Sequence, residues 1–273
     1  MRTVFRAVVL VVLLAAPAAA EVVRIDVKSR ADIAAGQAFG TIGPYEKLSG
    51  TIFFAVDPAL PANKIVADID KAPRNGAGKV EFSADFFLIK PKSMDRANGA
   101  VLYEVSNRGG KGMLGFFNHA AGSLDPGTAA EMGDGFLLKQ GFTLLWVGWQ
   151  FDVPKRQGLV RLNAPTPTEN GRPIRGLVRS DFVVTDKETD HSLADRNHQP
   201  YAVADPQSPD NVLTVRDSVE GPRRTIPRNQ WTLDAAGVHM TAKFEPNKIY
   251  EVVYTSENPP LVGLGPAAIR DVI

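Results

Sequence analysis

The stretch ANGAVLYEVSNRGGKGMLG, residues 97–115, constrains the fold more than any other part of this chain. An apolar run over 100–105 leads into a glycine-rich turn, and a second apolar run follows at 142–150. Between them, residues 128–140 have helical character despite two internal glycines, and Gly141 suits a helix C-cap. Strand, helix and strand in this order predict a βαβ crossover, and hence a parallel sheet.

The glycine-rich turn carries the clearest candidate chemistry. Its backbone N–H groups can face a developing negative charge, which is how an oxyanion hole is built. We therefore predict an oxyanion-type or substrate-facing loop formed by Asn107, Arg108, Gly109 and Gly110. The alternative is a tight turn that uses glycine for positive φ. A serine nucleophile would sit on a Gly-x-Ser-x-Gly elbow, and this motif does not occur in the sequence.

Several other patterns favour structural explanations over functional ones. Gly110, Gly112 and Gly115 match a dinucleotide fingerprint, but Asp134 falls inside a predicted helix rather than at a strand end. A P-loop fails because Gly112 follows Lys111. We interpret the remaining polar and aromatic positions as a turn or capping serine, a partly buried structural histidine and two core tryptophans: Ser106, His119, Trp146 and Trp149.

A polar segment at 186–198 offers a second candidate site. It gathers oxygen and imidazole groups that could bind a divalent cation: Asp186, Glu188, Asp190, His191, Asp195 and His198. The spacing matches no EF-hand, HExxH or zinc pattern, so a solvated loop is favoured and we predict no metal and no cofactor. The sequence assigns no role to Tyr201, Trp231 or His239.

The chain divides into four predicted regions. Residues 1–20 read as an export signal, with Arg2 and Arg6 before an apolar core, and cleavage is predicted after Ala20. Residues 21–153 contain a β-rich part, with strands over 22–30, 45–57 and 79–91, and then the first half of the α/β sheet. Residues 154–245 form a β-rich insertion or cap, and residues 246–273 return to the core sheet with a strand at 249–255 and a short helix.

Composition limits the partners. The chain has 31 basic and 30 acidic residues without a basic block, which disfavours nucleic acid and anionic membranes. No segment approaches the roughly 20 apolar residues of a membrane span. Because there is no cysteine, stability has to come from a hydrophobic core rather than from disulfides. We therefore expect an exported, periplasmic or extracellular protein with a small-molecule ligand or substrate.

Three long segments carry a family resemblance. They are GPYEKLSG with NKIVADIDKAPRNGAGKVEFSADFFLIKP, YEVSNRGGKGML, and VVYTSENPPLVGLGPAAIRD. Over nearly all of 22–273 the chain resembles a bacterial family of large exported proteins named for an alpha/beta hydrolase domain. The resemblance implies an α/β-hydrolase-like core and, in longer members, a later Gly-x-Ser-x-Ser/Thr-Gly elbow, an acid and a histidine. No residue of this chain matches those catalytic positions, so we expect the chain to be the front part of a longer protein.

These observations give three hypotheses for function. The first is an exported α/β-hydrolase-family protein whose intact form is a serine esterase or amidase, with this chain inactive alone. The second is a non-catalytic exported β-rich protein that binds a ligand or partner through the glycine loop and the insertion. The third is a cation-binding module centred on 186–198.

Overall fold

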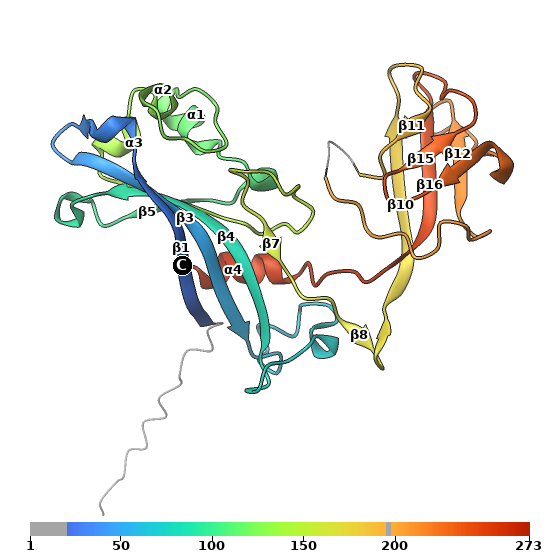
Figure 1. Ribbon diagram of the computed structural model, residues 1–273, viewed down its shortest axis with the longest axis horizontal. Helices are drawn as coiled ribbons and strands as arrows, with labels where there is room; N and C mark the ends of the chain where they lie inside the picture. The colour runs from blue at the N-terminus through green and yellow to red at the C-terminus, as the bar shows by residue number, and fades with distance from the viewer. Residues whose placement is uncertain (1–20, 195–197) are drawn as a thin grey trace, which may run out of the picture.

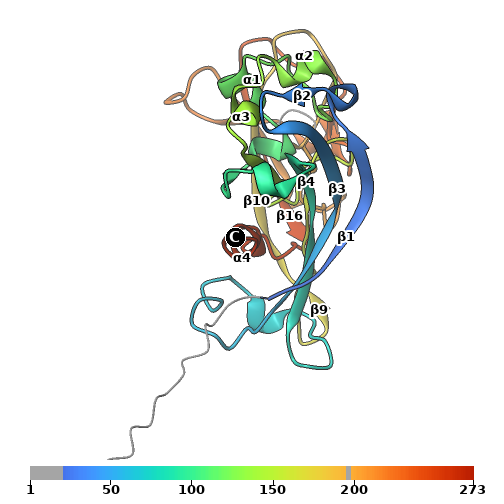
Figure 2. The ribbon, with the colours of Figure 1, turned by 90° about the vertical axis from the view of Figure 1, so that its left-hand side faces the viewer.

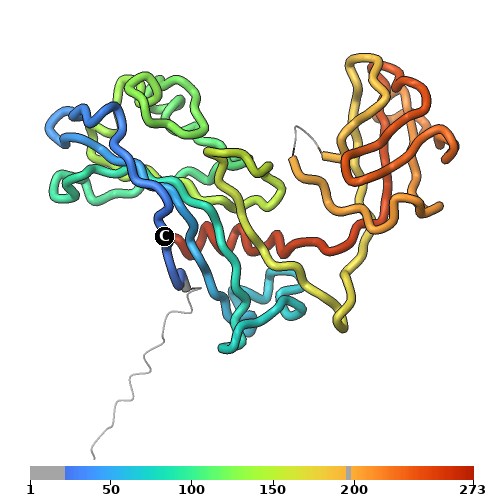
Figure 3. Tube along the Cα trace, viewed as in Figure 1, coloured from blue at the N-terminus to red at the C-terminus, as the bar shows by residue number. Residues whose placement is uncertain are grey.

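The computed structural model describes residues 21–194 and 198–273, which form two lobes joined by extended segments (Figure 1 and Figure 3). The predicted export signal and Asp195 lie outside the described residues. None of the helices in the described residues has the length and apolarity needed to cross a membrane.

The first lobe is built on a sheet that, in the described part of the chain, has seven strands. Its order is β1 (Glu21–Asp32), β3 (Gly43–Val56), β4 (Val80–Pro91), β6 (Thr143–Val147) and β5 (Val101–Glu104). The short strands β2 (Ala38–Phe39) and β7 (Leu162–Asn163) pair with β3 and β4. The three N-terminal strands predicted from alternating hydrophobicity are therefore confirmed as β1, β3 and β4.

The βαβ crossover is confirmed at one pair of strands. β5 and β6 run parallel, with Val101 opposite Thr143. The connection is not the single helix predicted over 128–140, because Gly133 and Gly135 have φ of 59° and 69°, values outside the helical region. Three short helices take its place: α1 (Met113–Asn118), α2 (Ala129–Met132) and α3 (Phe136–Lys139).

The predicted α/β-hydrolase-like core is wrong for this chain. Strands hold 35% of the residues and helices 15%, with four α-helices in the described residues, so the structure is mostly β-sheet. Apart from β5–β6, the strand pairs of the first sheet are antiparallel. The prediction inferred a parallel sheet from one crossover. Apolar and polar residues alternate along β3 and β4, however, and this pattern is typical of antiparallel strands.

The second lobe is also built mostly from β-strands. Its largest sheet has the order β10 (Arg175–Val183), β16 (Ile249–Glu257), β12 (Val212–Arg216) and β13 (Arg224–Thr225). A smaller sheet joins β11 (Asp190–His191), β15 (Val238–Met240) and β14 (Trp231–Leu233), and β8 (Thr168–Glu169) pairs with β9 (Arg172–Pro173). The prediction that the strand at 249–255 rejoins the first sheet is wrong, because β16 pairs with β10 and β12.

The chain does return to the first lobe through α4 (Leu264–Asp271). Leu264, Ala267 and Ala268 are buried against one face of the first sheet, beside Ile52 and Phe54 of β3. Val272 packs partly against the same cluster, whereas Ile269 is half-buried and Ile273 is 91% exposed. Figure 2 shows α4 beside the twisted strands β3 and β4.

The opposite face of the first sheet carries α1, α2 and α3. Tyr45, Phe87 and Trp146 pack there with Leu114 and Leu138 of the helices. Residues two apart on a strand share a face, so Lys47 and Ser49 follow Tyr45 onto this helical face, and Asp85 precedes Phe87 onto it. On this face of β3 and β4, the apolar side chains lie under the short helices, and polar side chains follow them along the strands where the helices end.

Candidate functional site

The predicted oxyanion-type loop folds as a tight turn. Asn107–Gly109 forms a 3-10 turn in which Arg108 has φ of 52° and Gly109 has φ of 72°. A Cβ on Gly109 would lie 2.4 Å from the backbone oxygen of Val160, so this glycine allows a close approach of two backbones. The amide of Val160 donates to the oxygen of Gly109 at 3.2 Å, which fixes the loop against the segment before β7.

Four backbone amides of this region donate to acceptors within the chain. The amides of Gly112 and Met113 donate to the two carboxylate oxygens of Glu104 at 3.0 and 2.8 Å. The amide of Arg108 donates to Oε1 of Gln150 at 2.8 Å, and that of Gly110 donates to the oxygen of Asn107 at 3.2 Å. An oxyanion role for residues 107–110 stays a prediction. In this conformation the carboxylate of Glu104 already occupies the amides of Gly112 and Met113.

The neighbouring residues named from the sequence are placed as follows. Ser106 is fully buried, and its hydroxyl has no hydrogen-bond partner. His119 is exposed in the left-handed conformation at the end of α1, so its predicted partial burial is wrong. Trp146 is a core residue, as predicted, and its indole N–H donates to Glu104. Trp149 is half-buried beyond the end of β6 and donates to the oxygen of Ser106 at 2.6 Å.

Lys111 is the most perturbed ionisable group near the loop. Its side chain is buried beneath the loops at 124 and 158, and Nζ donates to the backbone oxygens of Leu124, at 2.6 Å, and Gly158. Nζ also lies 4.5 Å from the centroid of the Phe87 ring. Burial penalises the ammonium form and lowers the pKa of Lys111 to about 8.

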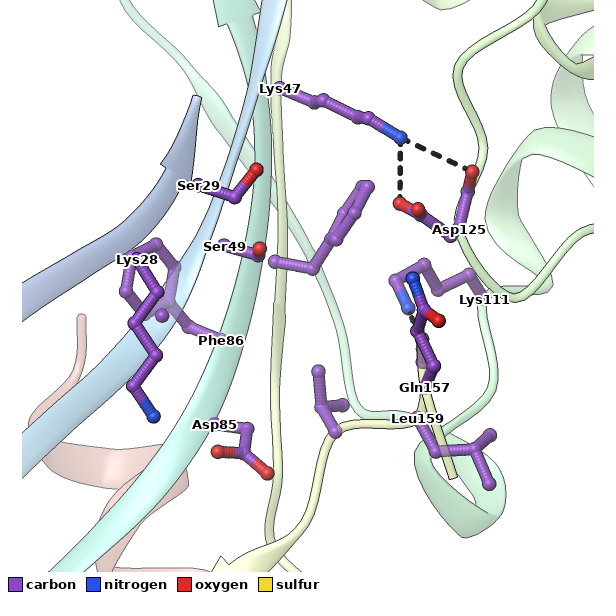
Figure 4. Close-up of a pocket in the computed structure, with 14 residues that line it drawn as sticks. Lys28, Ser29, Lys47, Ser49, Asp85, Phe86, Lys111, Asp125, Gln157 and Leu159 are labelled. Atoms are coloured by element: carbon purple, nitrogen blue, oxygen red, sulfur yellow. Dashed lines mark hydrogen bonds and ion pairs between the residues drawn. The ribbon is translucent and has the colours of Figure 1, made fainter. Parts of the chain in front are cut away.

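A cavity of about 270 Å³, which we call the inner cavity, opens beside Lys111 on the helical face of the sheet (Figure 4). Its polar wall combines strand residues and loop residues, including Lys28, Ser29, Lys47, Ser49, Asp85, Lys111, Asp125 and Gln157. In Figure 4, Lys47 extends toward Asp125, and its Nζ lies 2.7 Å from Oδ1 of that residue. Of the three lysines in the wall, Lys47 is paired with Asp125, whereas Lys28 and Lys111 form no ion pair with a carboxylate of the described residues.

A second cavity, of about 490 Å³, shares Lys28, Asp85 and Leu159 with the inner cavity. Thr51 and Ser83 of the sheet line it, together with residues from the segment before and along β7: Lys155, Arg156, Arg161 and Asn163. We name it the outer cavity. Because the two cavities share wall residues, a single elongated ligand could occupy both.

Asp85 stands between the two cavities. Its backbone amide donates to the oxygen of Arg161 at 3.0 Å, and its backbone oxygen accepts from the amide of Gly148 at 2.8 Å. Burial raises the pKa of the Asp85 carboxyl, while Lys28 and Arg161 act in the opposite direction. A carboxyl with a raised pKa can donate a hydrogen bond when protonated as well as accept one.

The polar segment at 186–198 does not assemble into a metal site within the described residues. No group of three His, Asp or Glu side chains there is placed to hold a metal ion, and Asp195 lies outside the described part. Asp190 instead contacts His239 at 2.5 Å, and the ring of His191 stacks on Phe182 at 3.8 Å. His239, to which the sequence assigns no role, thus joins β15 to β11.

Sequence reasoning missed most residues of the two cavities. The sequence placed Lys111 in the glycine-rich turn and in a rejected P-loop pattern, without a role of its own. It gave no role to the other charged residues of the two cavities, Lys28, Lys47, Asp85 and Arg161. A signal was present in β3 and β4, where Lys47, Ser49 and Asp85 interrupt the apolar side of strands that are otherwise buried. Comparisons of the chain with family models, with curated proteins and with solved structures gave no match, so its function has to be argued from this geometry.

Proposed function

We propose that this chain is an exported, non-catalytic protein that binds a small polar molecule in the inner cavity. The observation that carries the proposal is the convergence of polar side chains from separate segments on one cavity. Lys47 and Ser49 come from β3 and Asp85 from β4, while Lys111 and Gln157 come from loops. These residues replace apolar ones on a sheet face that is otherwise part of the core.

The chemistry of the wall favours a ligand with both charged and hydrogen-bonding groups. Lys47 and Lys111 lie 5.8 and 4.5 Å from the centroid of the Phe87 ring, so two cations contact one aromatic ring. Ser49 and Gln157 add neutral donors and acceptors. Pockets that bind small molecules commonly combine apolar wall with a few converging polar groups of this kind.

A thermal-shift screen tests the proposal. Carboxylates, phosphate esters, sugars and amino acids would be added to the wild type, to Ser49→Trp and to Ser218→Trp. Ser49→Trp fills the inner cavity, whereas Ser218 is exposed in a turn of the second lobe and serves as the matched control. A ligand near 100 times its Kd should raise the Tm of the wild type and of Ser218→Trp by roughly 5 °C.

The same screen can overturn the proposal. Ligand binding in the inner cavity requires that the shift disappear in Ser49→Trp. If no compound of these classes stabilises the wild type, or if Ser49→Trp responds as the wild type does, the inner cavity is not a ligand site. The proposal that the chain is non-catalytic would be contradicted if the protein hydrolysed p-nitrophenyl acetate and a fluorophosphonate abolished that hydrolysis.

The export part of the proposal is carried by the pattern of residues 1–20. Arg2 and Arg6 precede an apolar segment that ends in Ala18, Ala19 and Ala20. Expression in a bacterium with a secretion pathway should place the protein outside the cytoplasm. N-terminal sequencing should then find Glu21 as the first residue, and a cytoplasmic protein that retains Met1 or Arg2 would contradict export.

A further inference from the structure

The outer cavity has an unusual balance of charge. Four cationic side chains line it, Lys28, Lys155, Arg156 and Arg161, against one carboxylate, Asp85. No ion pair within 4 Å joins any of these four to a carboxylate among the described residues, whereas Lys47 of the inner cavity is paired with Asp125. The outer cavity therefore holds positive charge that the described part of the chain leaves uncompensated.

Arg161 presents buried donors that lack acceptors. Its Nη2 donates to the oxygen of Phe151 at 3.1 Å and to Oε1 of Gln199 at 3.2 Å, which hold the guanidinium in place. Its Nε and Nη1 are buried and have no hydrogen-bond partner. Buried donors without acceptors are costly and uncommon in folded proteins, so the guanidinium beside the cavity keeps hydrogen-bonding capacity that the chain does not use.

A second orphaned polar atom lies in the wall of the same cavity. Thr51 is 5% exposed, and its hydroxyl has no partner. Thr51 belongs to β3, whereas Arg161 belongs to the segment before β7, so the two walls of the cavity each carry unsatisfied groups. A hydroxyl and a guanidinium fork are both suited to oxygen acceptors, and the fork matches the spacing of oxygens on a phosphate or carboxylate.

The single carboxylate does not cancel this preference. With Asp85 ionised, the four cations still leave a net charge of +3 in the wall. A monoanion compensates only part of this charge, and a dianion compensates more. Burial raises the pKa of Asp85, which makes its charged form less favourable in this wall.

From the unpaired cations and the orphaned donors, we infer that the outer cavity binds a tetrahedral dianion, the phosphate or sulfate group of a small molecule. Lys28, Lys155 and Arg156 supply exposed positive charge, and Arg161 and Thr51 lie in the wall beside them with hydrogen-bonding groups that the chain leaves unused. This inference deepens the proposed function, on which it rests, by naming the group that anchors the ligand. The inner cavity then receives the remainder of the same molecule.

Isothermal titration calorimetry with the full chain tests this inference. Inorganic phosphate, inorganic sulfate and acetate would be titrated at constant ionic strength, so that a general salt effect is separated from binding. We expect phosphate and sulfate to bind and acetate to bind at least about tenfold more weakly, because the Coulombic attraction grows with the charge of the anion. A difference between phosphate and sulfate identifies which head group the natural ligand carries.

Two double variants of equal charge change give the matched comparison. Lys155→Gln with Arg156→Gln removes two exposed cations of the outer cavity, and Lys64→Gln with Arg172→Gln removes two exposed cations elsewhere. The first should weaken phosphate binding by about tenfold or more, and the second should leave it within about twofold. Arg161→Lys keeps the charge but loses the fork, and it should also weaken phosphate binding.

The inference is overturned if neither phosphate nor sulfate binds at concentrations up to ~10 mM. It is also overturned if the two double variants weaken binding equally. Its failure is distinguishable from that of the proposed function. If uncharged compounds still stabilise the wild type but not Ser49→Trp, the inner cavity is a ligand site and only the anion assignment is wrong.

Discussion

The ammonium of Lys111 lies 4.5 Å from the centroid of the Phe87 ring, inside the wall of the inner cavity. Two backbone oxygens, from Leu124 and Gly158, accept its hydrogen bonds. The charge is therefore held by a ring face and by carbonyl dipoles rather than by a carboxylate. Such a contact stabilises an ammonium less than water does, which is why burial lowers the pKa of Lys111.

This arrangement predicts that stability rises with pH above neutrality. The pKa of Lys111 is about 8 in the folded state against 10.5 in the unfolded chain. Between these values the unfolded state binds more protons, so raising the pH favours folding. Relative to Lys111→Met, the wild type should gain roughly 3 kcal/mol of unfolding free energy from pH 7.5 to 10.5.

Urea unfolding at several pH values measures this gain. Subtracting the Lys111→Met curve removes the contributions of other titrating groups, and Lys64→Met, at an exposed position, should follow the wild type. Parallel curves for the wild type and Lys111→Met would show that Lys111 has an ordinary pKa.

A second prediction concerns Glu104, whose carboxylate accepts hydrogen bonds at the N-terminus of α1. Its carboxylate accepts from the amides of Gly112 and Met113 and from the indole of Trp146. Glu104→Ala leaves three donors without this acceptor and should destabilise the chain by about 3 kcal/mol or more. Glu104→Gln retains one acceptor oxygen and should lie between Glu104→Ala and the wild type.

Urea unfolding followed by tryptophan fluorescence checks this order. Glu220→Ala removes an exposed carboxylate from the second lobe and should stay within about 0.5 kcal/mol of the wild type. If Glu104→Ala were as stable as Glu220→Ala, the contacts of Glu104 would not stabilise the glycine loop.

A third prediction separates backbone strain from steric contact at Gly109. Gly109 and Gly78 have nearly the same φ, 72° and 76°, but a Cβ at Gly109 meets the oxygen of Val160 at 2.4 Å, whereas nothing lies within 4 Å at Gly78. Gly78→Ala should cost about 1 kcal/mol from its positive φ alone. Gly109→Ala should cost about 1–3 kcal/mol more because the loop must move away from Val160. Equal losses of unfolding free energy in the two variants would rule out a tight contact at Gly109.

The first sheet shows what a pattern of residues can predict. Alternation in β1, β3 and β4 was sufficient to place the strands, and the apolar run in β6 was sufficient to place a buried strand. The alternation of apolar and polar residues indicates which side of a strand is buried, but it does not indicate which strand lies beside it. For this reason β16 was predicted as a strand correctly and was assigned to the wrong sheet.

The residue pattern could not predict the conformation of residues 128–140 or the positions of the two cavities, and the reason differs between them. Residues 128–140 have the composition of a helix, but Gly133 and Gly135 adopt positive φ. A Cβ on Gly133 would lie 2.0 Å from the oxygen of Asn118, a long-range contact that composition does not reveal. The cavities depend on long-range pairing, which brings Lys28 and Arg161 into one wall with Asp85. Only the polar interruptions of β3 and β4 were visible in the sequence.

A final prediction concerns His239 in the second lobe, whose ring lies between two carboxylates. Nδ1 is 2.5 Å from Oδ1 of Asp190, and Nε2 is 3.1 Å from Oδ1 of Asp234. Hydrogen bonds to Asp190 and Asp234 raise the pKa of His239 above 6.5, and hydrogen bonds to Thr189 and His239 lower that of Asp190. The imidazolium therefore joins β15 to β11 and to the turn before β15.

The stabilisation from this contact should be present only over a limited pH range. A raised histidine pKa contributes stability fully below 6.5 and loses it as the pH rises through the folded-state pKa. The lowered aspartate pKa contributes above 3.8 and loses its effect as the pH falls through the folded-state value. His239→Gln should therefore lower Tm most near pH 5.5 and least near pH 9, while His119→Gln, at an exposed position, changes little at either pH. A His239 pKa at or below 6.5 in an NMR titration, or an equal loss of Tm at both pH values, would show that the two carboxylates do not hold the ring in its charged form.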